Sequence, residues 1–402
     1  MDSLTLDKVY HAAYVLKSVA RKTDLIHAAG LCPDCDLYLK TENLQVTGSF
    51  KVRGAYYKIS QLTEEEKSKG VIASSAGNHA QGVALAAKEN GIPCVICMPD
   101  GAPISKVEAT KAYGAKVCLV KGAYDDAYDY ACELQEKEGY TFIHPFNDPE
   151  VIAGQGTIGL EILDQLSDVE VVLVPVGGGG LISGVAYAIK KLHPECRVYG
   201  VQAAGSASME QSLKQHEPIT LDTAATFADG IAVKHPGDLT FELVSKYVDG
   251  VVTVTDDETA CAILALMEKQ KLVTEGAGAV AVAAAMFGKV DIRGKKTVCL
   301  LSGGNIDVNI LSRVISSGLT IAGRNSTLTL QLEDKPGQLT DVSEIISRNG
   351  GNVVRVHYNQ ADPNLAITSC YLTLSIETRD GEQVEKIKKD LAASGFQLVS
   401  HT

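Results

Sequence analysis

Short apolar runs alternate with helical periodicity along the first 320 residues of the chain. Runs typical of buried strands lie at 71–73, 94–98, 116–120 and 141–143. A second series of such runs follows at 169–176, 197–202, 251–254 and 297–301. Between the early runs, at 78–90, 104–113 and 123–138, the apolar residues have the spacing of amphipathic helices. Strands that alternate with helices of this length predict parallel sheets covered on both faces, and two series predict two α/β lobes with a cleft between them.

Three further elements are predicted ahead of these runs. We expect an amphipathic helix over 5–21, a short strand over 36–42 and a helix from Lys51 to Leu62. The smaller lobe is then expected to span about 48–148, inside a larger part of the chain that spans 1–322.

The pattern changes after Arg324. Strand-like segments are predicted at 326–333, 352–358, 369–377 and 396–400, and helical segments at 337–349 and 382–393. The resulting order β-α-β-β-α-β is that of a small ferredoxin-like α+β unit. We therefore expect a second domain over 326–402, with the junction in the serine- and glycine-containing stretch 316–325.

Composition narrows the classes of function. Hydrophobic residues make up 45% of the chain and charged residues 21%, as in ordinary globular proteins. The formal net charge of −12 argues against binding to nucleic acid or to an anionic membrane surface. The uncharged stretch 171–189 contains Pro175 and four glycines, which favours a buried strand, a turn and a helix over a membrane span. The chain opens without the features of a signal peptide, so its ten scattered cysteines predict reduced thiols in the cytoplasm.

Four consecutive glycines, Gly177, Gly178, Gly179 and Gly180, separate the strand at 169–176 from a helix that begins near Leu181. Glycines allow backbone amides to converge at a helix N-terminus, where a phosphate is favoured. A turn without a ligand needs only one or two glycines. A dinucleotide fingerprint fails because its third glycine would fall on Ile182 or Ser183. The run therefore predicts a site for a monophosphate.

Two other small-residue stretches also follow predicted strands. Ser75, Ala76, Gly77 and Asn78 lead into a helix after the strand at 71–73, and their donors suit a carboxylate, although Ser and Asn could serve only as helix caps. Ser302 begins a Ser-Gly-Gly-Asn run after the strand at 297–301. Ligands of open α/β sheets bind beyond the carboxyl ends of the strands. We therefore expect these stretches and the glycine run to face one cleft.

Lys51 follows Phe50 and begins a predicted helix. A lysine amine that is kept neutral and accessible forms imines with carbonyl compounds, whereas most lysines at helix starts are simply solvated. His79 is expected to be a packed or capping residue. The pairs Cys32/Cys35 and Cys94/Cys97 have the spacing of zinc ligands, but the second pair would point to opposite faces of a strand and the first lacks two further ligands. We expect no metal site.

Five motifs, in this order, resemble those of fold-type II pyridoxal-phosphate enzymes, and among them most resemble the threonine dehydratases (threonine ammonia-lyases). The motifs are 47–51, 75–79, 152–157, 177–180 and 302–305. The resemblance covers 5–320 and implies pyridoxal 5'-phosphate as cofactor and a two-lobed fold similar to the tryptophan synthase β subunit. Residues 326–402 resemble an ACT domain, a regulatory module that commonly binds amino acids, through the motif at 334–339.

The resemblance implies roles for individual residues. Lys51 matches the Schiff-base lysine, Phe50 the residue packed near the cofactor ring, and Asn78 the residue bonded to the pyridoxal hydroxyl. Gly177 to Gly180 match the phosphate cradle, and Ser302 matches the partner of the pyridine nitrogen. In the ACT-like unit, the resemblance implies an effector near Pro336, Gly337, Gln338 and Leu339.

The implied reaction is a β-elimination. A serine hydroxyl at Ser302 cannot keep the ring nitrogen protonated as an aspartate would, which favours prompt elimination. Lys51 would take the Cα proton, the β-hydroxyl would leave, and the product would hydrolyse to a 2-oxo acid and ammonia. Serine racemases of this fold carry a serine where Ala76 stands, so dehydration is favoured over racemisation. Their divalent cation site is not matched either, because Gln202, Ala203 and Ala204 offer no carboxylate.

We therefore expect a cytoplasmic threonine dehydratase that also accepts serine, with isoleucine acting through the ACT-like unit. The alternatives are a serine dehydratase, a serine racemase of the same fold, or an inert amino-acid sensor. The exposed face and edges of a small ferredoxin-like sheet predict pairing between chains, as a homodimer or homotetramer.

Overall fold

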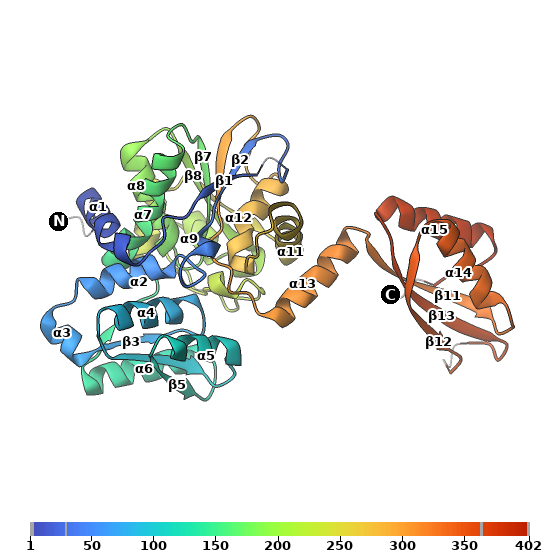
Figure 1. Ribbon diagram of the computed structural model, residues 1–402, viewed down its shortest axis with the longest axis horizontal. Helices are drawn as coiled ribbons and strands as arrows, with labels where there is room; N and C mark the ends of the chain where they lie inside the picture. The colour runs from blue at the N-terminus through green and yellow to red at the C-terminus, as the bar shows by residue number, and fades with distance from the viewer. Residues whose placement is uncertain (1–3, 29, 362–364, 400–402) are drawn as a thin grey trace. The chain divides into compact units, whose positions relative to one another are not determined.

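The computed structural model describes residues 4–28, 30–361 and 365–399. The chain divides into two compact units, Met1–Leu311 and Ser312–Thr402 (Figure 1). Helix α13 (Val308–Ile321) covers most of the stretch 316–325 in which the sequence predicts the junction, and the boundary between the two units falls within the same helix. Val314 and Gly318 are both buried and lie four residues apart, so they share one face of this helix.

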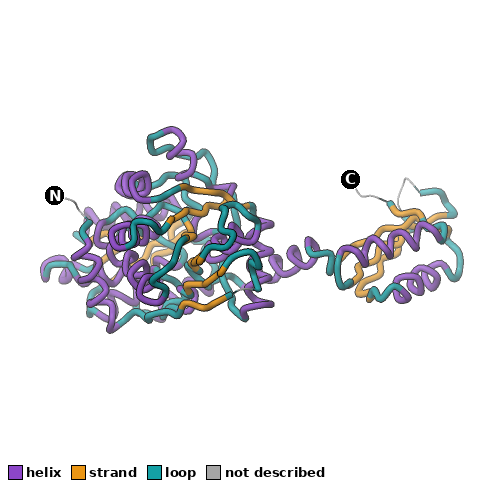
Figure 2. Tube along the Cα trace, turned by 90° about the horizontal axis from the view of Figure 1, so that it is seen from above, coloured by secondary structure: helices purple, strands orange, loops and turns teal. Residues whose placement is uncertain are grey.

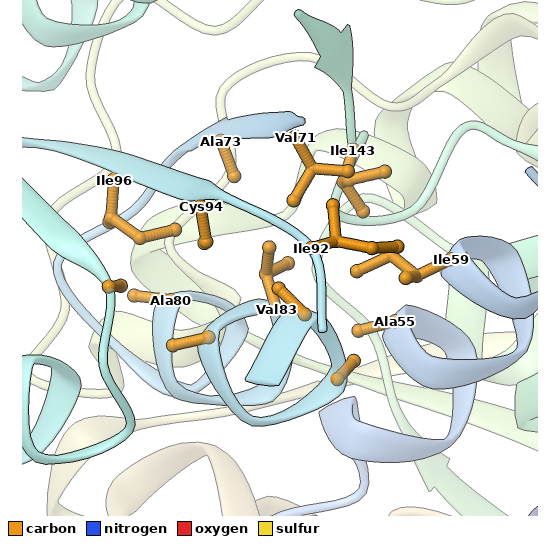
Figure 3. Close-up of a cluster of buried hydrophobic side chains, with 14 of the residues drawn as sticks. Ala55, Ile59, Val71, Ala73, Ala80, Val83, Ile92, Cys94, Ile96 and Ile143 are labelled. Atoms are coloured by element: carbon orange, nitrogen blue, oxygen red, sulfur yellow. The ribbon is translucent and has the colours of Figure 1, made fainter. Parts of the chain in front are cut away.

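The smaller lobe of the first unit is built on a parallel four-stranded sheet of order β5-β4-β3-β6. Its strands are β3 (Val71–Ser74), β4 (Cys94–Pro99), β5 (Lys116–Val120) and β6 (Thr141–Phe142). Its helices are α3 (Glu64–Lys69), α4 (Asn78–Glu89), α5 (Ile104–Ala112) and α6 (Tyr124–Glu138). Apolar side chains from α4 and the sheet form the core of the lobe, together with Ala55 and Ile59 of helix α2 (Lys51–Ser60) (Figure 3).

The larger lobe contains a six-stranded sheet of order β1-β2-β10-β7-β8-β9. Only the pair between β1 (Leu25–His27) and β2 (Asp36–Lys40) is antiparallel. The other strands are β7 (Val171–Pro175), β8 (Arg197–Ala203), β9 (Gly250–Val254) and β10 (Lys296–Leu300). The helices are α1 (Leu6–Val15), α7 (Pro149–Gln165), α8 (Gly180–Leu192), α9 (Ser208–Gln215), α10 (Asp238–Tyr247), α11 (Asp256–Ala265) and α12 (Gly276–Met286). The helix predicted over 5–21 thus ends at Val15, and a 3-10 turn, η1 (Leu16–Ser18), follows it.

Helix α2 packs closely against α7, because glycines line the contact. A Cβ atom at Gly154 would lie 2.7 Å from the Arg53 carbonyl oxygen, and one at Gly54 would lie 2.7 Å from the Val151 carbonyl oxygen. Both distances are too short for any residue larger than glycine without movement of the helices. The crossing therefore fixes the position of α2, and with it the start of that helix at Lys51.

A buried charge cluster also holds α2. The Arg53 guanidinium donates to Glu42 in the 3-10 turn η2 (Glu42–Leu44) at 2.8 Å and to Glu161 of α7 at 2.7 Å. Lys40 of β2, which is fully buried, donates to Glu161 at 2.6 Å and to the Thr23 carbonyl oxygen at 2.6 Å. Two cations and two carboxylates thus join three elements to α2 with every charge paired.

The second unit has the element order β-α-β-β-α-β that the sequence predicts. Its antiparallel sheet has the order β12-β13-β11-β14. The elements are β11 (Asn325–Glu333), α14 (Gln338–Arg348), β12 (Asn352–Asn359), β13 (Ser369–Glu377), α15 (Gly381–Ala393) and β14 (Gln397–Leu398). The two helices share one core with one face of the sheet (Figure 2). The predicted ferredoxin-like α+β fold is therefore confirmed.

The uncharged stretch 171–189 forms β7, the glycine turn and most of α8, as predicted. Across the described part of the chain, no helix combines the length and the apolar character that crossing a bilayer requires.

Candidate active site

Lys51 is the first residue of α2. Its Nζ donates a hydrogen bond of 2.9 Å to the Pro145 carbonyl oxygen and lies 5.3 Å from the centroid of the Phe50 ring. Desolvation lowers the pKa of Lys51 to about 8, and the negative charge of Glu275 acts in the opposite direction. An amine with this pKa is neutral in an appreciable fraction of molecules near neutral pH, as a nucleophile or base must be.

Two histidines lie near this amine, and both stay neutral. Burial, with a smaller contribution from the charge of Lys51, lowers the pKa of His79 to about 3 and that of His144 to about 4. His79 Nε2 donates to the Ile143 carbonyl oxygen at 2.8 Å. His144 Nδ1 accepts from the backbone N–H of Asn147 at 2.8 Å. His79 is thus a packed, hydrogen-bonded residue, and neither ring is placed to act as a base at neutral pH.

Asn78 begins α4 at the carboxyl end of β3. Its Nδ2 donates to Glu275 Oε1 at 2.6 Å, and its Oδ1 accepts from Asn305 Nδ2 at 2.7 Å. The same Asn305 nitrogen donates to the Thr47 carbonyl oxygen at 2.8 Å. These contacts bring together three stretches that the sequence places far apart, namely 47–51, 75–78 and 302–305. In the second of them, Ser75 Oγ accepts from the Gly77 N–H at 3.1 Å.

Ser302 follows β10 and is buried. Its hydroxyl donates to the Ala277 carbonyl oxygen at 3.1 Å, and its own carbonyl oxygen accepts from the Phe50 N–H at 3.1 Å. Ser49 and Gly303 also pair as an isolated β-bridge. The end of the central strand of the larger sheet is therefore bonded directly to the backbone that leads into Lys51.

The glycine run turns the chain from β7 into α8. Gly179 caps α8 with φ +97°, a left-handed conformation that glycine adopts freely. A Cβ at Gly178 would lie 2.4 Å from the Phe146 ring, and one at Gly180 would lie 2.8 Å from Phe146 Cα. Phe146 follows Pro145, whose carbonyl oxygen holds the Lys51 amine. The run thus forms a backbone-lined cradle at a helix N-terminus. The segment Pro145–Phe146 connects this cradle to Lys51, because Pro145 bonds the amine and Phe146 packs on the glycines.

Glu275 is a residue of this cluster that sequence reasoning missed. It immediately precedes α12, is 4% exposed and has Asn78 as its hydrogen-bond partner. Burial, helped by the charge of Asp229, raises the pKa of Glu275 to about 7, and the charge of Lys106 opposes the rise. The sequence does carry a signal for Glu275, because it is a single carboxylate directly before the glycine- and alanine-rich run 276–288, whose first helical turns are apolar.

A cavity of about 560 Å³ borders this cluster and is lined by Glu275, Asn305, Lys106 and Asp229 together with neighbouring residues. Lys106 of α5 in the smaller lobe forms an ion pair of 2.5 Å with Asp229 of the 3-10 turn η4 (Asp229–Ile231) in the larger lobe. The cavity therefore lies where the two lobes meet, and it offers a small polar molecule access to the residues around Asn78.

Comparison with known proteins places the chain among enzymes. The family model described as "Pyridoxal-phosphate dependent enzyme" matches residues 16–303. The chain belongs to this family of pyridoxal-phosphate dependent enzymes. It is 51% identical to the L-threonine ammonia-lyase of Thermotoga maritima over 98% of this chain and 99% of the relative. The L-threonine ammonia-lyase of Geobacter sulfurreducens is 44% identical over 95% of each chain.

Solved structures also resemble a large part of this chain. The processed form of threonine deaminase isoform 2 from Solanum lycopersicum has a TM-score of 0.73 at 40% identity, covering 78% of this chain and 89% of that one. Maize serine racemase has a TM-score of 0.74 at 35% identity, covering 79% of this chain and 99% of that one. The predicted fold of a two-lobed pyridoxal-phosphate enzyme is therefore confirmed.

The described residues contain no group of three or more His, Cys, Asp or Glu side chains arranged to hold a metal ion. Cys32, Cys35, Cys94 and Cys97 are buried free thiols. Gln202, at the end of β8, is fully buried, and its side chain bonds to the Ser206 carbonyl oxygen and the Glu210 N–H.

The predicted effector residues lie in the second unit. Gly337 caps α14 with φ +96°, and a Cβ at this position would have no atom within 4 Å. Pro336, Gln338 and Leu339 flank it in an exposed or half-buried turn. Asp334, in the same turn, accepts hydrogen bonds from the Tyr358 hydroxyl at 3.2 Å and from Gln360 at 2.6 Å. The turn is thus an open backbone surface beside the strand β12.

Proposed function

We propose that the protein is a threonine ammonia-lyase, which converts L-threonine to 2-oxobutanoate and ammonia and also accepts L-serine, which it converts to pyruvate. The observation that carries the proposal is a connected set of contacts: the low-pKa Lys51 amine is bonded to Pro145, the next residue Phe146 packs on the glycine cradle, and Asn78 is bonded to Glu275 of the larger lobe. Full-length relatives named L-threonine ammonia-lyase support the choice of substrate.

The residues fit pyridoxal 5'-phosphate. The cradle at Gly177 to Gly180 has no room for a Cβ at Gly178 or Gly180, yet it presents backbone N–H groups at the start of α8, as a phosphate requires. Lys51 would hold the cofactor covalently, with Phe50 packed near its ring. Asn78 and Ser302 would contact its hydroxyl and its pyridine nitrogen. When bound, the cofactor supplies an electron sink for the electron pair left at the substrate Cα.

The chain's own residues then have distinct tasks. Lys51 Nζ takes the proton from the substrate Cα, which its pKa of about 8 permits because part of the amine is neutral at neutral pH. Ser75, Ala76, Gly77 and Asn78 bind the substrate carboxylate at the start of α4, where backbone N–H groups and the helix dipole favour an anion. His79 and His144 stay neutral and do not compete for the proton.

Serine racemisation is the alternative within the same fold, and the likeness to maize serine racemase supports weighing it. Racemisation requires a proton carrier on the second face of Cα. Ala76 packs against the apolar core of the smaller lobe and offers no such group. We therefore favour elimination over racemisation, and chiral analysis of recovered serine distinguishes the two.

We further propose that the second unit is an ACT domain, so that the enzyme consists of a catalytic domain over 1–322 and a regulatory domain over 326–402. Isoleucine would bind near Gly337 and lower activity. The ferredoxin-like fold and the open turn before α14 support this assignment. Strand β12 is a sheet edge with exposed Val354 and Val356, which supports pairing between chains in a homodimer or homotetramer.

A cytoplasmic location is proposed with this function, and the free cysteines support it. The deciding experiment is a turnover assay with threonine and with serine, in the presence and absence of isoleucine. Release of 2-oxobutanoate from threonine, lost in Lys51→Ala, is the expected result. A protein that binds pyridoxal phosphate yet releases no 2-oxo acid from either substrate would contradict the proposal. Chiral analysis of the recovered serine would then distinguish a racemase from an inert amino-acid sensor.

A further inference from the structure

We propose that Glu275 is a positioning residue that fixes the orientation of the Asn78 side-chain amide and sets the electrostatic field around Lys51. The inference rests on the proposed function, because it concerns the same site. Glu275 would act through Asn78 and through space, and would touch neither the substrate nor the cofactor. Three sets of contacts support this role.

The first is the pair of hydrogen bonds on the Asn78 amide. Asn78 Nδ2 donates to Glu275 Oε1 at 2.6 Å, while Asn78 Oδ1 accepts from Asn305 Nδ2 at 2.7 Å. A flipped amide would set oxygen against oxygen at Glu275 and nitrogen against nitrogen at Asn305. The carboxylate and the second amide therefore select one orientation, which leaves one further N–H of Asn78 Nδ2 for a ligand.

The second is the way the carboxyl group is seated. A Cβ at Gly303 would lie 2.3 Å from Glu275 Oε1, so the absence of a side chain there makes the space that the carboxyl group occupies. The Glu275 N–H donates to the Gly303 carbonyl oxygen at 3.1 Å, and a Cβ at Gly230 would lie 3.5 Å from the same Oε1. The backbone of Glu275 is thus bonded to Gly303, and its carboxyl group occupies the space left by the missing side chain of the residue next to Ser302.

The third is the set of charges that face Glu275 from each element around it. Asp229 lies on η4, Lys106 on α5 and Lys51 on α2, and the neutral Asn78 amide lies on α4. Burial outweighs the two lysines and raises the pKa of Glu275 to about 7. The ionised form raises the pKa of Lys51 against the effect of desolvation. Glu275 therefore couples the hydrogen bonding of Asn78 to the protonation of the amine.

The test uses the full-length protein with pyridoxal phosphate bound, compared with Glu275→Gln, Glu275→Ala and the surface variant Glu64→Gln. Glutamine has the same shape and its oxygen can still accept from Asn78, so it removes the charge and keeps the position. The first measurement is the absorbance of the bound cofactor, titrated from pH 6 to pH 10. In Glu275→Gln the midpoint should fall by about one pH unit, since a nearby negative charge is lost. Glu64→Gln should titrate as the wild type does.

The second measurement separates position from charge. Glu275→Ala frees the Asn78 amide and should weaken cofactor affinity about tenfold, a loss that corresponds to one well-formed hydrogen bond. Glu275→Gln should bind the cofactor within about twofold of wild type, because its amide oxygen replaces the lost acceptor. For threonine, Glu275→Gln should lower kcat more than it changes KM. If Glu275→Ala fails to fold, the titration of Glu275→Gln decides by itself.

The inference is overturned if Glu275→Gln titrates like the wild type, or if Glu275→Ala binds the cofactor with wild-type affinity. The failure of the proposed function would look different. In that case the wild-type protein would bind pyridoxal phosphate and turn over neither threonine nor serine, while the titrations of wild type and Glu275→Gln would still report on the role of Glu275.

Discussion

Substitution of Gly178 by alanine should push the Phe146 ring out of its place and weaken cofactor binding. A Cβ at Gly178 would lie 2.4 Å from the Phe146 Cε1 atom, and ordinary contact begins at 3.4 Å, so the ring must retreat by about 1 Å. Overpacking of this kind costs about 1–3 kcal/mol. Phe146 follows Pro145, which binds the Lys51 amine, so the strain reaches both the cradle and the lysine.

The assay is a titration of cofactor-free protein with pyridoxal phosphate, together with thermal unfolding. Gly178→Ala should bind the cofactor at least about fivefold more weakly than wild type, as about 1 kcal/mol of strain implies. Gly101→Ala is the matched control, because a Cβ there has no atom within 4 Å. The double variant Gly178→Ala with Phe146→Ala removes the clash and should recover part of the lost affinity. Affinity in Gly178→Ala that equals that of the control would refute this account of the cradle.

Three other predictions follow from the described contacts. Arg53→Ala should lower the free energy of unfolding by about 3–5 kcal/mol in urea denaturation, because it leaves Glu42 buried without its cationic partner and leaves Glu161 with Lys40 alone. Arg293→Ala on the surface is the control, and equal midpoints would contradict the prediction. The pKa of Lys51 is lowered from 10.5 in the unfolded chain to about 8 in the folded protein, so folding releases a proton between these pH values. The stability of the cofactor-free protein should therefore rise with pH across that window, by at most about 3 kcal/mol, and Lys51→Met should remove the rise. Removal of 326–402 should abolish the response to isoleucine and leave threonine turnover in place, and inhibition that survives the truncation would show that the effector binds elsewhere.

Much of the first unit could be predicted from local pattern. The strand at 116–120 has the predicted bounds, and the helix that begins at Asn78 differs by one residue at its end. The candidate site residues Asn78, Ser302 and the glycine run could be proposed for the same reason, because each follows a strand of a parallel sheet. The rule that ligands bind at the carboxyl ends of such strands needs only the order of elements.

The contacts that tune the site could not be predicted in this way. Glu275 and Asn78 are bonded across 197 residues of sequence, and no spacing rule connects them. The close approach of Phe146 to Gly178 depends on how a loop of one lobe packs against a turn of the other. The helix over 316–321 was not predicted from the sequence, because serine and glycine disfavour helices intrinsically, whereas burial of one face of the helix can outweigh that preference.

The buried charge cluster around Arg53 lies in the same helical turn as Lys51. Arg53 and Lys40 carry two positive charges, Glu42 and Glu161 two negative ones, and the four groups bond to one another. The quartet carries no net charge, and the causes of the lowered pKa of Lys51, two residues away, are desolvation and the opposing charge of Glu275. A substitution that removes one charge of the quartet would leave a net charge near Lys51, so the charge balance of the cluster has to be kept whole if the helix is to be anchored without a change in the acidity of its first residue.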